Sequence, residues 1–328
     1  MMPNKVFPFF CGIGLAVNIP FDFDNAANLI YVNGTIEDID GLLDPIGPVK
    51  LYLQFDTQSW LEFESPENDT SNHNDLDVYG IVKLQSENGT LVDAYEDSFI
   101  ALLDFQQESI FSKGFIGVGQ NGPFLNQRHS IGIVLSEKRL MIGISDFDFN
   151  ATYCHPNTFL QVPFSSPIPQ DRISRKLAGQ FRLVELHTFV PVVLSVTETA
   201  QLMTEDFLIQ IIPERLFIPE IFFREILSRV PVLTSGLMFE NCEQVLHLLP
   251  IISLELFDEA GFVAGTIHFY PSDYIVREAG RDDTCSLILA SSGTYAPHTS
   301  IIGFDPLLLR ESNILISDTH LSFCDRID

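Results

Sequence analysis

Residues 49–60 read Val-Lys-Leu-Tyr-Leu-Gln-Phe-Asp-Thr-Gln-Ser-Trp, a run of β-forming side chains that ends in a short polar segment. Valine, leucine, tyrosine and phenylalanine favour extended backbone, so the first part of this run is predicted to be a strand. Asp56 follows the strand directly, and Thr57, Gln58 and Ser59 continue the polar segment. The chain therefore carries one carboxylate, with hydroxyl groups near it, at the end of a predicted strand.

Short β-rich runs separated by turn residues continue along the chain. The clearest are Ile30–Val32, Val49–Phe55, Val78–Leu84, Ser98–Leu103, Ser130–Val134 and Leu140–Ile144. Asn88-Gly89 lies between two such runs and is predicted to be a hairpin tip. The strongest helical pattern is Pro219–Arg229, where Glu220 suits the helix N-terminus and Pro231 prevents continuation. The chain is therefore predicted to be all-β in class, mostly β with few short helices.

The composition bounds the function. The chain has 328 residues, of which 46% are hydrophobic and 19% charged, so it can bury sizeable cores. This length suits two ordinary domains, or one domain built from two lobes. The formal net charge of −26 would repel phosphates and anionic lipid, so a nucleic-acid partner is not expected. Nor is a membrane span expected, because no later apolar stretch is long enough.

The N-terminus and the sequons point to a compartment. Lys5 precedes an apolar run, Val6 to Val17, which has the length of a signal-peptide core or of a buried first strand. Four Asn-x-Ser/Thr sequons are candidate glycosylation sites, with chance in a turn-rich chain as the alternative: Asn33, Asn68, Asn88 and Asn150. Both features predict an extracellular or secretory-pathway protein.

The cysteines fit the same compartment. None of the five forms a Cys-x-x-Cys pair, so zinc ribbons and thioredoxin-type sites are not indicated. If Cys11 leaves with a signal peptide, four remain, namely Cys154, Cys242, Cys285 and Cys324. An even number suits two disulfides in an oxidising compartment, and three pairings are open.

Metal and cofactor motifs are not indicated either. The eight histidines are scattered, without a His-x-His or His-Glu-x-x-His spacing, so neither a metal nor a cofactor is expected. Asp22-Phe23-Asp24 and Asp146-Phe147-Asp148 alternate acidic and aromatic residues. We interpret both as half-buried strands rather than as calcium sites.

The opening stretch resembles the first active-site loop of the pepsin-like aspartic proteases (peptidase A1 domain), in which a strand leads into Phe-Asp-Thr-Gly-Ser. Asp56, Thr57 and Ser59 match that loop, and Gln58 stands in place of its glycine. Further segments similar to family motifs follow in the same order, at 114–119, 129–134, 139–146, 249–254, 271–275, 301–304 and 318–323. Together the resemblance spans about residues 28–324.

This resemblance implies a bilobal pepsin-like acid protease fold with a central cleft. The expected divisions are a signal peptide or first strand at 1–20, an N-terminal β lobe at 21–165, a linker at 166–176 and a C-terminal β lobe at 177–328. The linker region is rich in proline, serine and basic residues. The resemblance also implies a disulfide between Cys242 and Cys285 and, as in some relatives, a second between Cys154 and Cys324.

The family's chemistry requires two aspartates, one from each lobe, which share a proton and activate a water molecule. The second lies nine residues before the proline that opens the following helix, which is Pro219 here. The residue nine positions before Pro219 is Gln210. Where the family has Asp-Thr-Gly-Thr, this chain has Gln210-Ile211-Ile212-Pro213. The resemblance thus implies that Asp56 is a relic without its partner. In the first loop, Gln58 adds a side chain where the two loops should meet closely.

The substrate-covering flap also departs from the family. The position at which the family has its flap tyrosine is occupied by Gln85 in this chain, or by Tyr79 if the hairpin is longer. A glycan on Asn88, at the expected flap tip, would obstruct the mouth of the cleft. The expected cleft lining is therefore Thr57, Gln58, Ser59 and Gln85.

The expected function is that of a secreted, glycosylated pseudoprotease, a monomer that binds a peptide or protein without cutting it. Two alternatives remain open. One is a divergent aspartic endopeptidase that acts at acidic pH. The other is a structural or protease-inhibitor-like surface protein that works through outer loops.

Overall fold

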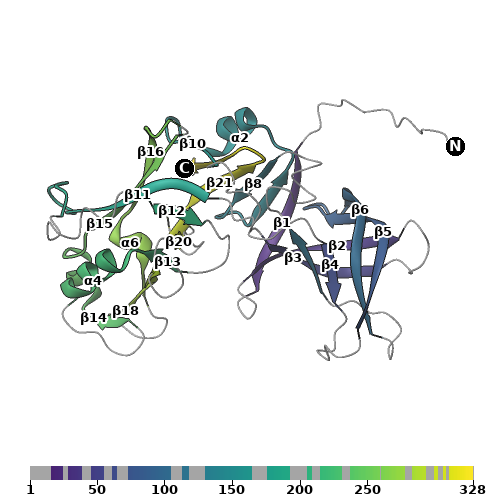
Figure 1. Cartoon of the computed structure of the whole chain (residues 1–328), viewed down its shortest axis with the longest axis horizontal. Coiled ribbons are helices and arrows are strands. Elements are labelled where there is room, and N and C mark those ends of the chain that lie inside the picture. Colours follow the sequence, from purple (N-terminus) through teal and green to yellow (C-terminus); the bar gives the residue numbers. More distant parts are fainter. Residues whose placement is uncertain are drawn as a thin grey trace.

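The computed structural model describes residues 16–24, 29–38, 46–54, 61–64, 73–104, 113–117, 130–164, 176–192, 205–208, 215–230, 237–258, 260–277, 283–292, 299–301, 306–307 and 310–327. Strands dominate these residues, as the sequence predicted. The described helices are α2 (Asp146–Tyr153), α4 (Glu220–Arg229), α5 (Cys242–Leu246) and α6 (Pro271–Tyr274). None of them has the length and hydropathy that crossing a bilayer requires. Two bodies of strands lie side by side (Figure 1).

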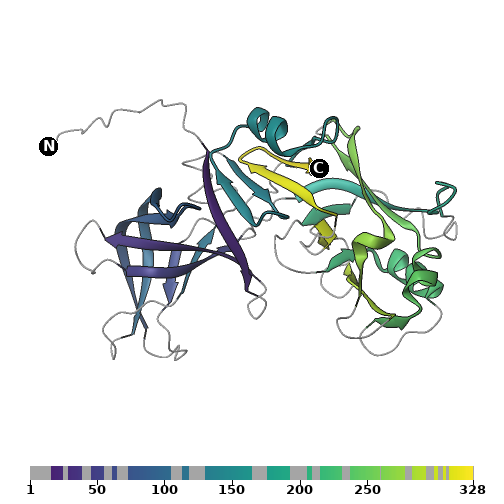
Figure 2. The same cartoon turned by 180° about the vertical axis from the view of Figure 1, so that it is seen from behind.

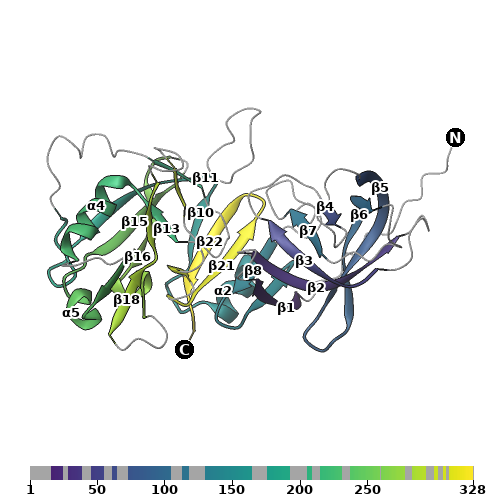
Figure 3. The same cartoon turned by 90° about the horizontal axis from the view of Figure 1, so that it is seen from below.

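The first sheet has twelve strands, in the order β10-β22-β21-β8-β9-β1-β2-β3-β7-β4-β6-β5. Its strands are β1 (Val17–Asp24), β2 (Leu29–Asp38), β3 (Ile46–Gln54), β4 (Leu61–Glu64), β5 (His73–Gln85), β6 (Leu91–Asp104), β7 (Lys113–Gly117), β8 (Ser130–Val134), β9 (Arg139–Ile142), β10 (Leu160–Pro163), β21 (Ser312–Ser317) and β22 (His320–Asp325). An additional pairing between β2 and β5 folds the N-terminal part of the sheet on itself. The C-terminal strands β21 and β22 therefore lie between the two bodies, as Figure 3 shows in yellow.

The second sheet has seven strands, in the order β16-β15-β11-β12-β20-β13-β19. They are β11 (Lys176–Val184), β12 (Glu205–Leu208), β13 (Leu216–Ile218), β15 (Ile251–Phe257), β16 (Val263–Phe269), β19 (Leu289–Ser291) and β20 (Thr299–Ile301). A smaller sheet joins β14 (Met238–Glu240), β18 (Thr284–Leu287) and β17 (Ile275–Arg277). The view from behind shows α4 and its neighbours on the outer side of this second body (Figure 2).

Burial follows the side-chain alternation that strands impose. In β1, Ile19 and Phe21 are buried, whereas Pro20 and Asp22, which alternate with them, are exposed. β8 is buried along its whole length: Val134 lies in one cluster with Phe149 of α2, whereas Ile131 and Ile133 belong to the main core. This packing is close: a Cβ on Gly132 would lie 2.8 Å from the Phe149 ring of α2. Glycine at this position thus lets the helix approach the sheet.

The two bodies repeat one pairing pattern. In the first, β7 pairs in parallel with β3 and antiparallel with β4, which pairs in parallel with β6. In the second, β20 pairs in parallel with β12 and antiparallel with β13, which pairs in parallel with β19. The fold is therefore built from two related lobes. The linker prediction stays untested, because residues 165–175 lie outside the described residues, as do residues 1–15 of the signal-peptide prediction.

The strand, hairpin and helix predictions are confirmed. Each predicted β-run lies within or largely overlaps an observed strand. Gly89 has a φ of +81° in the turn between β5 and β6, which explains why Asn-Gly is found there. Pro219 is the N-cap of α4, and Glu220 starts the helix.

The interpretation of Asp146-Phe147-Asp148 as a strand is wrong, because these residues form the first turn of α2. The Ser145 side chain accepts a hydrogen bond from the Asp148 N–H at 3.1 Å and so caps the helix. Acidic residues in the first turn also suit the helix dipole. Asp22-Phe23-Asp24 does lie in a strand, at the end of β1.

Gly34 is predicted to be essential for the junction of β2, β3 and β5. A Cβ there would lie 2.6 Å from the Lys83 carbonyl oxygen and 2.7 Å from Leu51 Cδ1, so Gly34→Ala must displace the backbone of β5. We expect a loss of about 1–3 kcal/mol in the free energy of unfolding, measured by urea denaturation. The control Asn33→Ala, at an exposed neighbouring position, should stay within about 0.5 kcal/mol of wild type. Equal stability of the two variants would contradict the prediction.

Candidate functional site

The first-lobe candidate loop begins where β3 ends. Leu51, Tyr52 and Leu53 are buried, and the Tyr52 hydroxyl donates a hydrogen bond to Asp24 Oδ2 at 2.6 Å. Burial, together with this hydrogen bond, raises the pKa of Tyr52 to about 12. The contact fixes the end of β3 to the end of β1. The candidate residues themselves, Asp56, Thr57, Gln58 and Ser59, lie outside the described residues, so their role stays a prediction.

The strand register frames this loop from both sides. Tyr52 of β3 and Glu62 of β4 both pair with Phe115 of β7. Phe115 is followed two residues later by a glycine, as is Ile301 of β20 in the second lobe. Ile301 pairs with Leu208 and with Phe217. Matched strand positions are therefore ten residues apart in the first lobe and nine apart in the second.

This register locates the position of the second catalytic aspartate in two further ways. Asp56 lies four residues after Tyr52, and four residues after Leu208 is Ile212. Asp56 lies six residues before Glu62, and six residues before Phe217 is Ile211. The sequence count from the helix start reached Gln210, which lies outside the described residues. None of the three positions carries a carboxylate.

The nearest upstream acids are held elsewhere. Glu205 and Asp206 lie within β12, where their backbones pair with Gly179 and Ala178 of β11. A four-residue slip that brought either acid to position 210 would break this pairing.

The predicted flap positions lie on the β5–β6 hairpin. Gln85 is exposed and is the last residue of β5, where it pairs with Leu91, whereas Tyr79 pairs with Ser98 farther from the turn. At the tip, Glu87 forms an ion pair of 2.8 Å with Arg139 of β9. The tip is therefore fastened to the β8–β9 turn, and covering of a cleft by this hairpin stays a prediction.

Three of the four sequon asparagines are described, and all three are exposed: Asn33 in β2, Asn88 in the hairpin turn and Asn150 in α2. Asn68 lies outside the described residues. Asn88 Oδ1 accepts hydrogen bonds from the Thr90 N–H at 3.1 Å and from the Thr90 hydroxyl at 2.7 Å. The asparagine and threonine of this sequon are thus in direct contact.

Both disulfides implied by the resemblance are present. Cys242 and Cys285 have Cα atoms 5.8 Å apart, and those of Cys154 and Cys324 are 5.3 Å apart. The first joins α5 to β18 within the second lobe. The second joins the end of α2 to β22, and so fastens the C-terminal hairpin to the first lobe.

The second-lobe segments 249–254 and 271–275, both similar to family motifs, contact each other directly. The buried Tyr274 hydroxyl donates to the Pro250 carbonyl oxygen at 2.5 Å. Burial raises the pKa of Tyr274 well above its usual value. Beside it, the Asp273 carboxylate accepts hydrogen bonds from the Tyr270 N–H at 2.8 Å and from the Ser272 hydroxyl at 3.2 Å. These contacts cap the short helix α6 and set it against β15.

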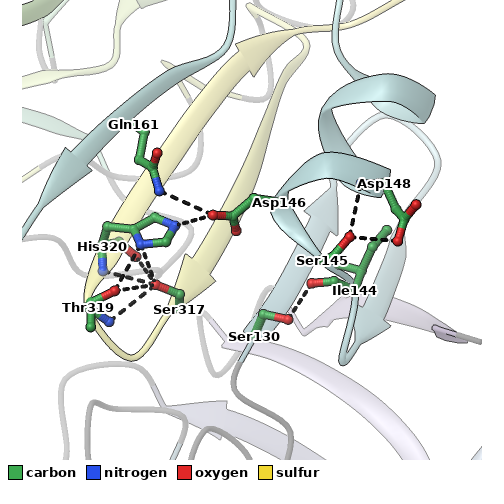
Figure 4. Close-up of polar contacts among 9 residues, drawn as sticks. All are labelled: Ser130, Ile144, Ser145, Asp146, Asp148, Gln161, Ser317, Thr319 and His320. Carbon is green, nitrogen blue, oxygen red and sulfur yellow. Dashed lines mark hydrogen bonds and ion pairs between the residues drawn. The ribbon is translucent and has the colours of Figure 1, made fainter. Parts of the chain in front are cut away.

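Sequence reasoning missed a polar cluster at the C-terminal hairpin (Figure 4). His320 Nδ1 lies 2.9 Å from Ser317 Oγ and 3.0 Å from Thr319 Oγ1, while Nε2 lies 3.1 Å from Asp146 Oδ2. The last contact is poorly directed for a hydrogen bond and is electrostatic when the imidazole is protonated. Gln161 of β10 donates to the same Asp146 oxygen at 3.2 Å. The cluster joins α2, β10 and the β21–β22 turn.

The order serine, histidine, aspartate is that of a nucleophilic triad, but the serine is already occupied. Ser317 Oγ accepts hydrogen bonds from the backbone N–H groups of His320 at 2.9 Å and Thr319 at 3.2 Å. It also lies 3.0 Å from the His320 carbonyl oxygen, and Ser317 is only 5% exposed. The hydroxyl therefore closes the hairpin turn, and a substrate cannot reach it. Nearby, Ser130 donates to the Ile144 carbonyl oxygen at 2.5 Å and closes the β8–β9 hairpin against α2 (Figure 4).

Metal ligands do not gather in larger groups among the described residues: no three or more His, Cys, Asp or Glu side chains lie close enough to hold an ion.

The two repeated lobes, with the C-terminal hairpin in the first sheet, define the class of bilobal pepsin-like all-β proteins. No protein-family model matches the chain, and no curated protein matches it in sequence. Among solved structures, it is similar to basic 7S globulin from soybean, with a TM-score of 0.63, 12% identity and 94% of each chain covered. It is also similar to conglutin gamma, a basic 7S globulin from lupine seeds, with a TM-score of 0.61, 13% identity and 94% of each chain covered. At such identities the likeness establishes the fold alone.

Ser317 is predicted not to react with a fluorophosphonate probe for serine hydrolases, because its oxygen is buried and already accepts two backbone N–H groups. Labelling of the full chain is measured by mass spectrometry, with a serine protease as the positive control. Labelling that disappears in Ser317→Ala would contradict this assignment.

Asp273 is predicted to make stability depend on pH. Burial raises the pKa of this carboxyl group, so the folded state binds the proton more tightly than the unfolded state. Its contribution to stability is therefore greatest at low pH and falls as the pH rises through the folded-state pKa. As the pH rises from 3 to 7, the free energy of unfolding of Asp273→Asn should increase relative to that of wild type, measured by urea denaturation. Asp318→Asn, at an exposed position, is the control; parallel pH profiles for Asp273→Asn and wild type would refute the prediction.

Proposed function

We propose that this chain is a catalytically inactive pepsin-like protein that binds a peptide or protein ligand without cutting it. The observation that carries the proposal is the absence of a carboxylate at each of the three positions reached for the second aspartate, Gln210, Ile211 and Ile212. A lone Asp56 has no partner with which to share a proton, so it cannot activate water as the aspartic protease pair does.

The first loop supports the same proposal. Gln58 replaces the glycine that lets the two catalytic loops approach each other. The second loop is also one residue shorter between matched strand positions. Both differences act against the close symmetric contact that two carboxylates need in order to share a proton.

The names of the structural neighbours are consistent with the proposal. Their names describe globulins, not peptidases. They are called basic, whereas this chain has a sequence pI of about 4.4. Any property of those globulins that depends on positive charge is therefore not carried over to this chain.

The ligand class follows from the fold and the charge. An extended peptide can bind a β-rich protein by adding backbone hydrogen bonds at a strand, which requires no catalytic group. The net charge of −26 favours a cationic ligand through electrostatic attraction. Two disulfides support an oxidising, secretory or extracellular location, where the sequons would carry glycans.

We expect the full chain to show no cleavage of acid-denatured haemoglobin between pH 2 and pH 5, because one carboxylate cannot hold and activate the water molecule. Cleavage is measured by the release of acid-soluble peptides, with pepsin as the positive control. Asp56→Ala is the matched variant and should behave as wild type does. Activity that Asp56→Ala abolishes would establish the alternative, a divergent aspartic endopeptidase.

A second measurement addresses binding. The full chain is screened against a library of random peptides, and the retained sequences are compared with the input. Enrichment of cationic, extended sequences supports the proposal. Retention of none would favour the other alternative, a surface protein that acts through outer loops.

A further inference from the structure

We propose that His187 and His247 bind one divalent transition-metal ion of the class that prefers imidazole, such as Zn²⁺, Cu²⁺ or Ni²⁺. His187 lies in the turn after β11, and His247 is the C-cap of α5. Their ring centres are 6.0 Å apart, and the ring planes differ by 29°. This site is independent of the proposed peptide binding, because it uses neither candidate loop.

The two rings are stacked, so a shared ion requires the rings to turn until one nitrogen of each points to it. The separation of the ring centres is compatible with such an ion. A zinc–nitrogen bond is about 2.0–2.1 Å long, so an ion bound by a ring nitrogen lies about 3 Å from the ring centre. Two rings that share an ion therefore have centres up to about 6 Å apart. The observed 6.0 Å is at the upper end of this reach. Both side chains are exposed, so rotation about their side-chain bonds is free to redirect a nitrogen of each ring.

The two segments are held together by Arg229 of α4. Its guanidinium donates to both Glu185 carboxylate oxygens, at 2.8 and 3.0 Å, and lies 3.4 Å from the Leu248 carbonyl oxygen. Glu185 closes the turn that carries His187, because its N–H donates to the Val190 carbonyl oxygen at 2.9 Å. Arg229 thus links the residue beside His247 to the turn that presents His187. The ligand pair is positioned by the scaffold and not by chance contact of two mobile side chains.

The electrostatics permit a cation here. The positive charge of Arg229 is offset by the carboxylates of Glu185 and Glu225, the latter at 3.0 Å. The net charge of −26 further attracts cations to the protein.

The ring nitrogens are available as ligands. Within the described residues neither imidazole has a hydrogen-bond partner, in contrast to His320, whose Nδ1 lies against two hydroxyl groups. No third His, Cys, Asp or Glu joins the pair among the described residues, so water completes the coordination. Binding is therefore expected to be weaker than at a four-ligand structural zinc site.

The experiment is calorimetric titration of the full chain with ZnCl₂ at pH 7.5. We expect saturable binding. His187→Asn and His247→Asn should each weaken binding about 100-fold, because a single imidazole lacks the chelate advantage. His155→Asn is the control, since His155 is exposed but pairs with no second imidazole, and it should bind as wild type does.

A second measurement needs no variant. Bound Cu²⁺ with ascorbate and oxygen oxidises the histidines that hold it, and mass spectrometry of peptides locates the added oxygen. We expect His187 and His247 to be oxidised first. The proposal is overturned if the other histidines react equally fast, if no saturable binding occurs, or if the single variants bind zinc as tightly as wild type.

Discussion

The first sheet is complete only when the end of the chain returns to it. β21 lies between β8 and β22, and all six of its residues are buried. Its polar Asn313 is buried with them, and the side-chain amide donates to the Tyr153 carbonyl oxygen at 2.7 Å. The Cys154–Cys324 disulfide closes a separation of 170 residues, a constraint worth about 4–5 kcal/mol in the chain-entropy view. The hairpin of β21 and β22 consequently comes from the range expected for the C-terminal lobe but completes the first sheet.

The strand pairing within the two lobes limits the chemistry that the fold can support. A pair of carboxylates has to be presented symmetrically by the loops that follow β3 and β12. The registers of β7 and β20 fix where those loops begin and end, and they set the matched strand positions ten residues apart in one lobe and nine apart in the other. The likeness to basic 7S globulins shows that this architecture also occurs in proteins whose names describe no protease. The fold does not by itself require catalysis.

Three histidine environments differ in the contacts that their ring nitrogens make. His320 lies against two hydroxyl groups and an aspartate, so its nitrogens serve the joint between α2 and the C-terminal hairpin. His268 is exposed, but its Nδ1 lies 3.0 Å from Ser253 Oγ, and partial desolvation lowers its pKa. His187 and His247 are exposed, and their nitrogens remain open to an external ligand.

The sequence by itself determined the local elements. Alternating β-formers predicted β3 and β8, Asn88-Gly89 predicted the hairpin turn, and Pro219 predicted the start of α4, because these signals depend on neighbouring residues only. The same local reasoning failed at Asp146, where alternation was read as a strand although the Ser145 cap marked a helix. Ser-x-x-Asp before Phe149 was the signal available.

Only the tertiary structure decided which distant residues meet. Asp146 and His320 come together because β22, near the C-terminal end of the chain, pairs with β10. No local sequence pattern encodes that long-range pairing. His187 and His247 meet because Arg229 ties a turn to the end of a short helix. Local periodicity reports which face of an element is apolar, whereas long-range pairing depends on the packing of every element at once.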